Sequence, residues 1–230
     1  MIKKSIPQEG LKLIACLSML IDHAAYIFDG SWEWRAVGRL AFPIYCFLLA
    51  EGVFHTRDPK KYGLRLLIAA VISEFAYDFA FYGRCLWLRQ NVMVTLLLGV
   101  LALEVMKRCP NLPSKILAAL PVAFVADVLH TDYSGYGVML VALFGLTREV
   151  PGKWPLLAVG MAILFWLMPS SVVTVLGIPV PVQLFGLAAL LPIALYSGEK
   201  LTRNKVAQWA FYLFYPVHMV LLRLLWLVLR

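Results

Sequence analysis

Charged residues are scarce in this sequence: they make up 15% of its 230 residues, whereas 62% are apolar, and the mean hydropathy is +0.80. Soluble domains contain about 25% charged residues and are about half apolar. The composition therefore excludes an ordinary soluble domain and predicts an all-α membrane protein. The length leaves room for one bundle of about eight to ten spans and no sizeable soluble domain, so we expect a single domain over residues 1–230.

Several common motifs are also missing. The cysteines form no CxxC pair, which argues against a thiolate metal site or a disulfide framework and predicts free thiols at Cys16, Cys46, Cys85 and Cys109. The Met-Ile-Lys-Lys start and the apolar stretch after it resemble a signal peptide, but no small-residue cleavage site follows. We therefore expect the first apolar segment to be a membrane span. The sequence shows no internal repeat and no low-complexity segment.

The apolar residues gather in nine segments, each bounded by charged residues or by Gly and Pro, which we predict to be membrane-spanning helices. They cover residues 10–29, 37–54, 62–82, 90–106, 115–130, 135–148, 154–168, 180–197 and 207–229. Several are shorter than the roughly 20 residues that cross a bilayer. Residues 168–181 (MPSSVVTVLGIPVP) are apolar but broken by prolines and serines. We interpret them as a re-entrant or interfacial segment, so the expected number of spans is about nine.

The basic residues of the loops predict the orientation of these spans. Loops on one side hold Lys3, Lys4, Arg57, Lys60, Lys61, Lys107, Arg108, Lys115, Arg148, Lys153, Lys200, Arg203 and Lys205. Loops on the other side hold only Arg35, Arg39, Arg84 and Arg89. Because Lys and Arg concentrate in cytoplasmic loops, we expect a cytoplasmic N-terminus and a multi-pass protein of the cell inner (plasma) membrane in contact with its lipids. The net charge of +8 is scattered over short loops, so no nucleic-acid partner is expected.

Ionisable residues inside the spans are candidates for function, because an unpartnered charge is costly in hydrocarbon. A helical rise of about 1.5 Å per residue places a group of acids, imidazoles and polar residues in the outer half of the bundle. The group consists of Asp22, His23, Glu74, Asp78, Asn91 and Thr95, with His218 nearer the middle of the ninth span. His130, at the end of a span, is interpreted as an interfacial residue.

Asp22 and His23 are adjacent within an otherwise apolar helix. Neighbouring helical residues point about 100° apart, so Asp22 is not expected to bond the His23 ring. Either Asp22 orients a different group, or the partner of His23 comes from another helix. Glu74 and Asp78, four residues apart and hence on one helix face, are the predicted partners.

A second, basic group is expected at the cytoplasmic ends of the spans. It contains Lys12, Arg57, Lys60, Lys61 and Arg65, with Glu51 and His55 beside them. Such a group suits a phosphorylated cytosolic donor, and Lys61 and Arg65 are spaced to hold one phosphate group between them. Loop cations are equally expected from the rule that sets orientation, so this interpretation stands beside a purely topological one.

These residues lie in blocks that resemble the TraX family, whose namesake N-acetylates the F-pilin subunit. The blocks are LKLIACLSMLIDHAAYIF (11–28), GRLAFPIYCFLLAEGVFHTRDPKKYGLRL (38–66), NVMVTLLLGV (91–100), YSGYGVMLVALFG (133–145) and FYLFYPVHMVLL (211–222). The family is similar to a wider group of membrane acyltransferases that includes heparan glucosaminide N-acetyltransferase. That group typically has an arginine, ten residues and a catalytic histidine, and here Lys12 and His23 keep the spacing.

The resemblance implies an acetyl-CoA-dependent N-acetyltransferase that needs no metal. It implies that His23 is the general base or acyl carrier, with Asp22, Glu74 and Asp78 in supporting roles. The expected binding residues for coenzyme A are Lys12, His55, Arg57, Lys61 and Arg65. Those expected for the acceptor or the developing oxyanion are Arg39, Glu51, Asn91, Thr95 and His218. The acceptor is expected to be an amine at the extracytoplasmic side, on a peptide N-terminus or an amino sugar.

Three other functions fit parts of the pattern. An O-acyltransferase for a surface polysaccharide would use the same donor side. A proton-coupled transporter also needs intramembrane acids and histidines, although transporters often show internal repeats. A metal or haem protein would use His23 and His218, but no HxxxH pair supports it.

Overall fold

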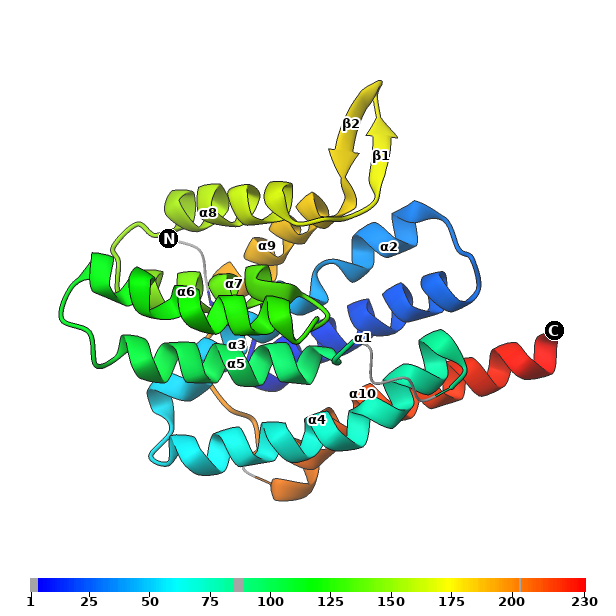
Figure 1. Cartoon of the computed structure of the whole chain (residues 1–230), viewed down its shortest axis with the longest axis horizontal. Helices are drawn as coiled ribbons and strands as arrows, with labels where there is room; N and C mark the ends of the chain where they lie inside the picture. Colours follow the sequence, from blue (N-terminus) through cyan, green and yellow to red (C-terminus); the bar gives the residue numbers. More distant parts are fainter. Residues whose placement is uncertain (1–3, 85–88, 203) are drawn as a thin grey trace. The chain divides into compact units, whose positions relative to one another are not determined.

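The computed structural model describes residues 4–84, 89–202 and 204–230, and Lys3, Cys85 and Arg203 lie outside them. Within these ranges the chain is helical apart from one two-stranded hairpin (Figure 1). The helices are α1 (Gln8–Ile27), α2 (Trp32–Gly38), α3 (Ala41–His55), α4 (Pro59–Tyr82), α5 (Val92–Met106), α6 (Leu112–Val128), α7 (Ser134–Thr147), α8 (Trp154–Leu167), the 3-10 helix η1 (Val182–Ala189), α9 (Leu190–Ala194) and α10 (Lys205–Leu229). The hairpin pairs β1 (Val172–Val175) with β2 (Ile178–Pro181).

Polar residues and prolines at the helix starts explain where several helices begin. The side chains of Asp58, Asn91 and Asn204 accept hydrogen bonds from backbone N–H groups in the first turns of α4, α5 and α10. Asn111 forms a reciprocal capping box with Ser114 at the start of α6. Short polar side chains suit these positions because the first N–H groups of a helix have no partner within it. These caps separate helices that apolar patterning alone would run together.

The chain divides into two compact units, and α3 and α8 continue from one unit into the other. The first unit consists of Met1–Tyr45 and Met161–Arg230, and the second is Cys46–Gly160. The expectation of one domain over residues 1–230 stays a prediction.

In the first unit, α1 packs against α2 and α10, and α2 packs against η1. The segment before α1 meets the segment before α10: Ser197 donates its N–H to the Ile6 carbonyl, and Gln8 donates to the Glu199 carbonyl. Glu9 accepts from the backbone N–H groups of Leu201 and Thr202. These contacts hold the N-terminal ends of α1 and α10 side by side, so the two helices run in the same direction.

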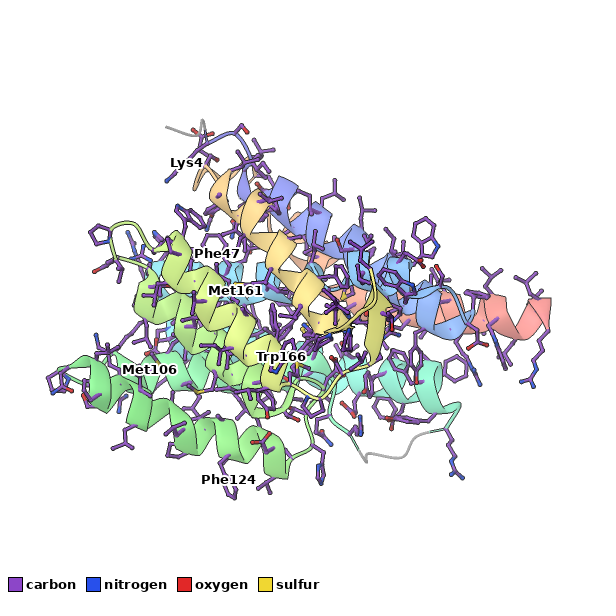
Figure 2. All side chains as sticks on the ribbon, turned by 90° about the horizontal axis from the view of Figure 1, so that it is seen from above. Lys4, Phe47, Met106, Phe124, Met161 and Trp166 are labelled. Atoms are coloured by element: carbon purple, nitrogen blue, oxygen red, sulfur yellow. The ribbon has the colours of Figure 1, made fainter. Side chains whose placement is uncertain are left out.

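In the second unit, α5, α6 and α7 pack on one another and α4 packs on α5. Glycine permits the close approach of α5 and α7, because a Cβ at Gly99 would lie 2.9 Å from a Val141 methyl group. The outer faces of the helices are apolar; Phe124 on α6, labelled in Figure 2, is 67% exposed. A surface of this kind is expected where lipid surrounds a helix.

Three stretches are long and apolar enough to cross a membrane within the described residues: Gln8–Ile27, Trp32–His55 and Gln208–Leu229. Four shorter apolar helices of 10–17 residues in the same ranges are Val92–Met106, Ser134–Thr147, Trp154–Leu167 and Val182–Ala194. A helix lies within or across each predicted span, but crossing by nine helices stays a prediction. The expected eighth span, 180–197, starts with the last two residues of β2 and continues as the 3-10 helix η1 and the short α9. The all-α fold class is confirmed apart from this small hairpin, which covers 172–181 within the stretch interpreted as a re-entrant or interfacial segment.

Candidate functional site

His23 on α1 forms a close pair with His218 on α10 in the first unit. The Nδ1 atom of His23 lies 2.7 Å from Nε2 of His218, and the two rings are nearly parallel, with an interplanar angle of 4°. His218 is buried, and Tyr215, one turn before it on α10, packs near both rings. Two imidazoles therefore meet at a contact between helices that are distant in the sequence.

The backbone of α10 fixes the proton positions in this pair. His218 Nδ1 lies 2.6 Å from the Phe214 carbonyl oxygen, which can only accept, so Nδ1 carries a proton. In neutral His218 the Nε2 atom then accepts, and Nδ1–H of His23 donates to it. The remaining lone pair of neutral His23 is on Nε2. This tautomer assignment follows from the hydrogen-bond pattern and makes His23 Nε2 the basic atom of the pair.

Asp22 faces the α2 side of the first unit. Its carboxylate forms an ion pair of 3.0 Å with Arg35 and a second ion pair with Arg39, whose guanidinium also donates to buried Gln183 on η1. A Cβ at Gly38 would overlap the Asp22 side chain, so glycine is required for this approach. Asp22 thus orients Arg35 on α2 and Arg39 at the C-terminal end of α2. The next residue, His23, instead bonds His218.

Lys12 lies on the same helix as His23, near its other end. Its Nζ is 5.0 Å from the centre of the Phe211 ring on α10. Phe211 precedes His218 by two turns, so Lys12 and His23 both face α10, about 16 Å apart along α1. The Lys12 side chain is half-buried. It lies near the end of α1 that meets the loop before α10.

Glu74 and Asn91 form the buried polar centre of the second unit. Glu74 Oε2 accepts from both the backbone and the side-chain N–H of Asn91, whose side chain also donates to the Ala70 carbonyl. Three other oxygens here, Glu74 Oε1, Ser73 Oγ and Thr95 Oγ1, are buried and have no hydrogen-bond partner within the described part of the chain. Asp78, one turn further along α4, is also buried. This cluster can accept additional hydrogen bonds.

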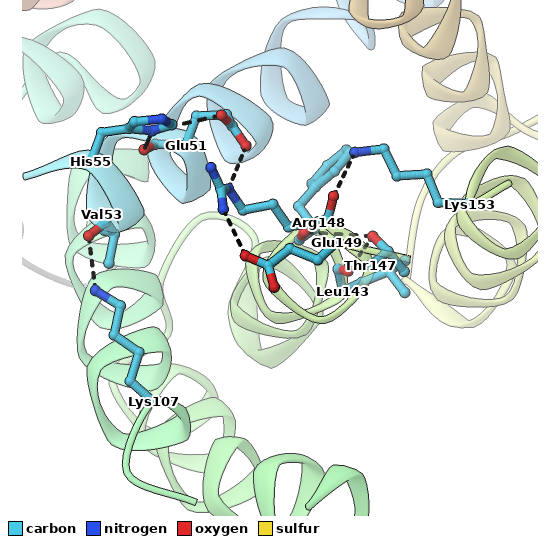
Figure 3. A network of polar contacts seen from close by, with 10 residues as sticks. Glu51, Val53, His55, Lys107, Leu143, Thr147, Arg148, Glu149 and Lys153 are labelled. Atoms are coloured by element: carbon cyan, nitrogen blue, oxygen red, sulfur yellow. Dashed lines mark hydrogen bonds and ion pairs between the residues drawn. The ribbon is translucent and has the colours of Figure 1, made fainter. Parts of the chain in front are cut away.

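A network of charged residues joins α3, α5 and α7 in the second unit (Figure 3). Glu51 accepts from Arg148 at 3.0 Å, and Lys107 donates to the Val53 carbonyl at 2.8 Å. Both cations also lie over the Phe54 ring, Lys107 at 5.0 Å and Arg148 at 5.1 Å from its centre. Glu51, predicted to bind substrate, is thus already paired with Arg148.

Four of the five predicted coenzyme A residues, His55, Arg57, Lys61 and Arg65, lie around the start of α4. Arg57 and Lys61 are exposed, and Lys61 forms a 3.2 Å ion pair with Asp58. The backbone N–H of Lys61 holds the pKa of Asp58 below its ordinary value, so Asp58 is ionised at neutral pH. Arg65 lies over the Tyr62 ring at 5.5 Å. The Nδ1 atom of exposed His55 is 2.7 Å from the Glu51 carbonyl and thus donates to it.

The structure identifies one partner of His23 on another helix, His218, which the sequence had suggested for binding the acceptor or the oxyanion. The predicted role of Glu74 or Asp78 in fixing the tautomer of His23 stays a prediction. Gln183 and Arg148 were not among the predicted site residues, yet they bond Arg39 and Glu51, which were. In the sequence, Arg148 is only one of the loop cations that predict orientation. Gln183 could have been found, because it is the one glutamine in an otherwise apolar span.

The chain is similar to known proteins over most of its length. Residues 7–226 match the family described as TraX protein. A protein of Dichelobacter nodosus, described as "Probable fimbrial assembly protein FimC, serogroup H1", is 35% identical over 238 residues, which cover 92% of each chain. An uncharacterized protein of Rickettsia prowazekii (strain Madrid E) is 29% identical over 93 residues, 40% of this chain and 34% of that protein. No solved structure matches significantly. The chain therefore belongs to the TraX family.

Proposed function

We propose that the protein is an integral membrane acetyltransferase that moves an acetyl group from cytosolic acetyl-CoA to an amine at the extracytoplasmic side. It would be a multi-pass protein of the inner membrane with a cytoplasmic N-terminus. The observation that carries the proposal is the His23–His218 pair. Two neutral imidazoles, one oriented by the other, form a base suited to acyl transfer at neutral pH.

In the proposed reaction the acceptor nitrogen attacks the thioester carbonyl, and His23 Nε2 removes a proton from it. The C–N bond forms, the C–S bond breaks, and the proton is passed from His23 to the departing coenzyme A thiolate. His23 becomes positively charged in between, and its Nδ1–H bond to His218 Nε2 strengthens at that moment because a charged donor makes a stronger hydrogen bond. His218 in turn is held by the Phe214 carbonyl.

A covalent variant uses the same atoms. His23 Nε2 would attack the thioester, carry the acetyl group as an acetylimidazole and release coenzyme A, and the acceptor amine would then take the acetyl group. Acetylation of His23 in the absence of acceptor distinguishes this route from direct transfer.

For the donor, we propose that Lys12 on α1 binds phosphates of coenzyme A, and the α4 cations Lys61 and Arg65 stay predicted phosphate ligands. The half-buried position of Lys12 and the 16 Å step along α1 to His23 suit a donor whose phosphates and thioester are far apart. For the acceptor, the relative described as a probable fimbrial assembly protein favours a fimbrial subunit, so we propose a peptide N-terminus as the amine.

The test uses purified protein in nanodiscs with labelled acetyl-CoA and three acceptors: a peptide with a free N-terminus, an amino sugar and a hydroxylated glycan. His23→Ala should lower acetyl transfer to the peptide by about 100- to 10,000-fold, the range for loss of a general base. His130→Asn is the matched control, since His130 is exposed and Asn tolerates its positive φ of 50°. Full activity of His23→Ala would refute the proposal, and labelling of the glycan alone would identify an O-acyltransferase.

A further inference from the structure

The hairpin after α8 ends in a tight turn with an unusual residue at its tip. Val175 pairs with Ile178, and the two residues between them, Leu176 and Gly177, have φ angles of 51° and 81°. Two consecutive positive φ values are typical of a type I′ turn, whose first position favours Asn, Asp or Gly. Leucine is sterically disfavoured there and has no local hydrogen bond to offer in return. The turn therefore carries a large apolar side chain despite its backbone cost.

The hairpin exposes this side chain and others like it. Leu176 is 97% exposed, and Val172 and Ile178 are 60% and 63% exposed. The sequence from Trp154 to Gly198, which includes the hairpin, contains no charged residue. An exposed hairpin in water usually carries charges that keep it soluble and unpaired.

The backbone of β2 also lacks donors on its outer edge. Val182 donates its N–H to the Ser171 carbonyl, and antiparallel pairs alternate between bonded and non-bonded types. Val173 and Val180 are therefore a bonded pair, whereas Thr174–Pro179 and Val172–Pro181 are non-bonded pairs whose backbone groups point outward. Both outward positions of β2 are prolines, which have no N–H. This edge cannot donate to an added peptide strand, and it leaves no unpaired N–H to be desolvated in lipid.

We propose that this hairpin lies in the interfacial region of the bilayer, with Leu176 inserted between the lipids of the extracytoplasmic leaflet. The leaflet follows from the predicted topology, because the hairpin comes after the seventh predicted span. Four-residue strands reach only about 13 Å, so the hairpin cannot cross the membrane. The outward N–H groups of Val172 and Thr174 on β1 need polar partners, which keeps that edge among the headgroups.

The hairpin continues an apolar surface of the helix before it. Ile163, Trp166 and Leu167 on α8 are 54%, 62% and 59% exposed (Trp166 is labelled in Figure 2). A tryptophan near the end of a lipid-facing helix is typical of the membrane interface. Because the exposed side of α8 leads directly into the hairpin, a lipid surface is the partner that covers both.

The test is site-directed spin labelling of the full chain in nanodiscs. Labels are placed by Leu176→Cys and, as an aqueous reference in the same unit, by Lys200→Cys, with Cys85 and Cys109 replaced by serine. At position 176 the label should collide more often with oxygen, which partitions into lipid, than with a water-soluble nickel chelate, and at position 200 the order should reverse. If the labels at both positions collided more often with the chelate, the proposal would be overturned. A label at position 176 that neither reagent reaches would also overturn it, because a protein partner would then cover the tip.

A second variant separates lipid insertion from hairpin folding. Leu176→Asn suits the left-handed turn better than leucine, so the hairpin should fold at least as well. A label introduced by Ile178→Cys should nevertheless shift toward the aqueous reagent when Leu176→Asn is added. An unchanged oxygen-to-chelate ratio would show that Leu176 does not hold the hairpin at the membrane. These measurements do not involve acetyl transfer, so their outcome is independent of the proposed reaction.

Discussion

The Nδ1 atom of His23 lies 2.7 Å from Nε2 of His218, although the two residues are 195 positions apart in the sequence. The Phe214 carbonyl fixes the protonated nitrogen of His218, and His218 in turn fixes that of His23. In the proposed reaction, this order of hydrogen bonds gives His218 a positioning role rather than direct contact with substrate.

Replacing His218 with alanine removes the acceptor for His23 Nδ1–H, and His23 can then adopt either tautomer. We expect the turnover of acetyl transfer to fall at least about 10- to 100-fold, as when metal-bound histidines lose the partners that orient them, with little change in KM for acetyl-CoA. His218→Gln places an amide oxygen near the former Nε2 and should recover part of the activity. If His218→Ala changed KM alone, His218 would be a binding residue instead.

The ion pairs of Asp22 with Arg35 and Arg39 should contribute to stability, because all three groups are largely shielded from solvent. Asp22→Asn leaves two guanidinium groups without their carboxylate. Removing one partner of a buried pair costs about 3–5 kcal/mol, and we expect a loss toward the lower end of this range in the free energy of unfolding in detergent. Asp29→Asn, at an exposed position with φ 51°, is the control and should change the stability by less than about 0.5 kcal/mol.

Glu74 can be tested by separating its charge from its hydrogen bonds. Glu74→Gln keeps an oxygen that can accept from Asn91, whereas Glu74→Ala leaves the Asn91 donors buried and unpaired. The alanine variant should lose about 1–3 kcal/mol of unfolding free energy for each unpaired group, and the glutamine variant less. A stable Glu74→Gln protein without acetyl transfer would mean that the carboxylate acts in the reaction, whereas full activity would make Glu74 a structural residue.

The close approach at Gly38 predicts a steric effect. Gly38→Ala places a methyl group against Asp22 and should destabilise the protein by about 1–3 kcal/mol, as overpacking usually does. Gly63→Ala is the matched control: its nearest neighbour, a Leu97 methyl group, would be 3.6 Å from the new Cβ, and alanine favours the helix. Thermal unfolding of the two variants compares them directly, and equal melting temperatures would contradict the predicted overlap.

The cations of α4 are predicted to bind coenzyme A. Lys61→Ala combined with Arg65→Ala should weaken binding of coenzyme A at least about tenfold, corresponding to 1.4 kcal/mol, because charge-assisted bonds to phosphate are lost. Calorimetric titration of the nanodisc-embedded protein measures this affinity. Lys115→Ala removes a loop cation on the same predicted side and should leave the affinity unchanged. If the double variant bound coenzyme A like the parent chain, the two cations would serve orientation in the membrane only.

Sequence patterns located most of the helices because apolar segments and their caps are local features. The helix predicted at 62–82 extends over Pro59–Tyr82, and that predicted at 207–229 extends over Lys205–Leu229. The structure of residues 168–181 was harder to predict, since a short apolar run with prolines fits either an irregular segment or an edge strand. The two turn residues, Leu176 and Gly177, give no standard hairpin signal, because leucine is rarely found at the first position of such a turn.

The candidate site was only partly predictable for a different reason. His23 was identified because a buried imidazole in an apolar helix is unusual. Its partner could not be identified from spacing, since contacts between non-consecutive helices depend on which faces pack together. Helical geometry correctly indicated that Asp22 would not bond His23, but it gave no sign that Arg35 and Arg39 would be its partners.

The parallel packing of α1 and α10 has a consequence for biosynthesis. His23 is synthesised long before His218, so in the proposed enzyme the base stays without its orienting partner until α10 is made. The proposed acetyl transfer would therefore begin only once α10 has packed against α1.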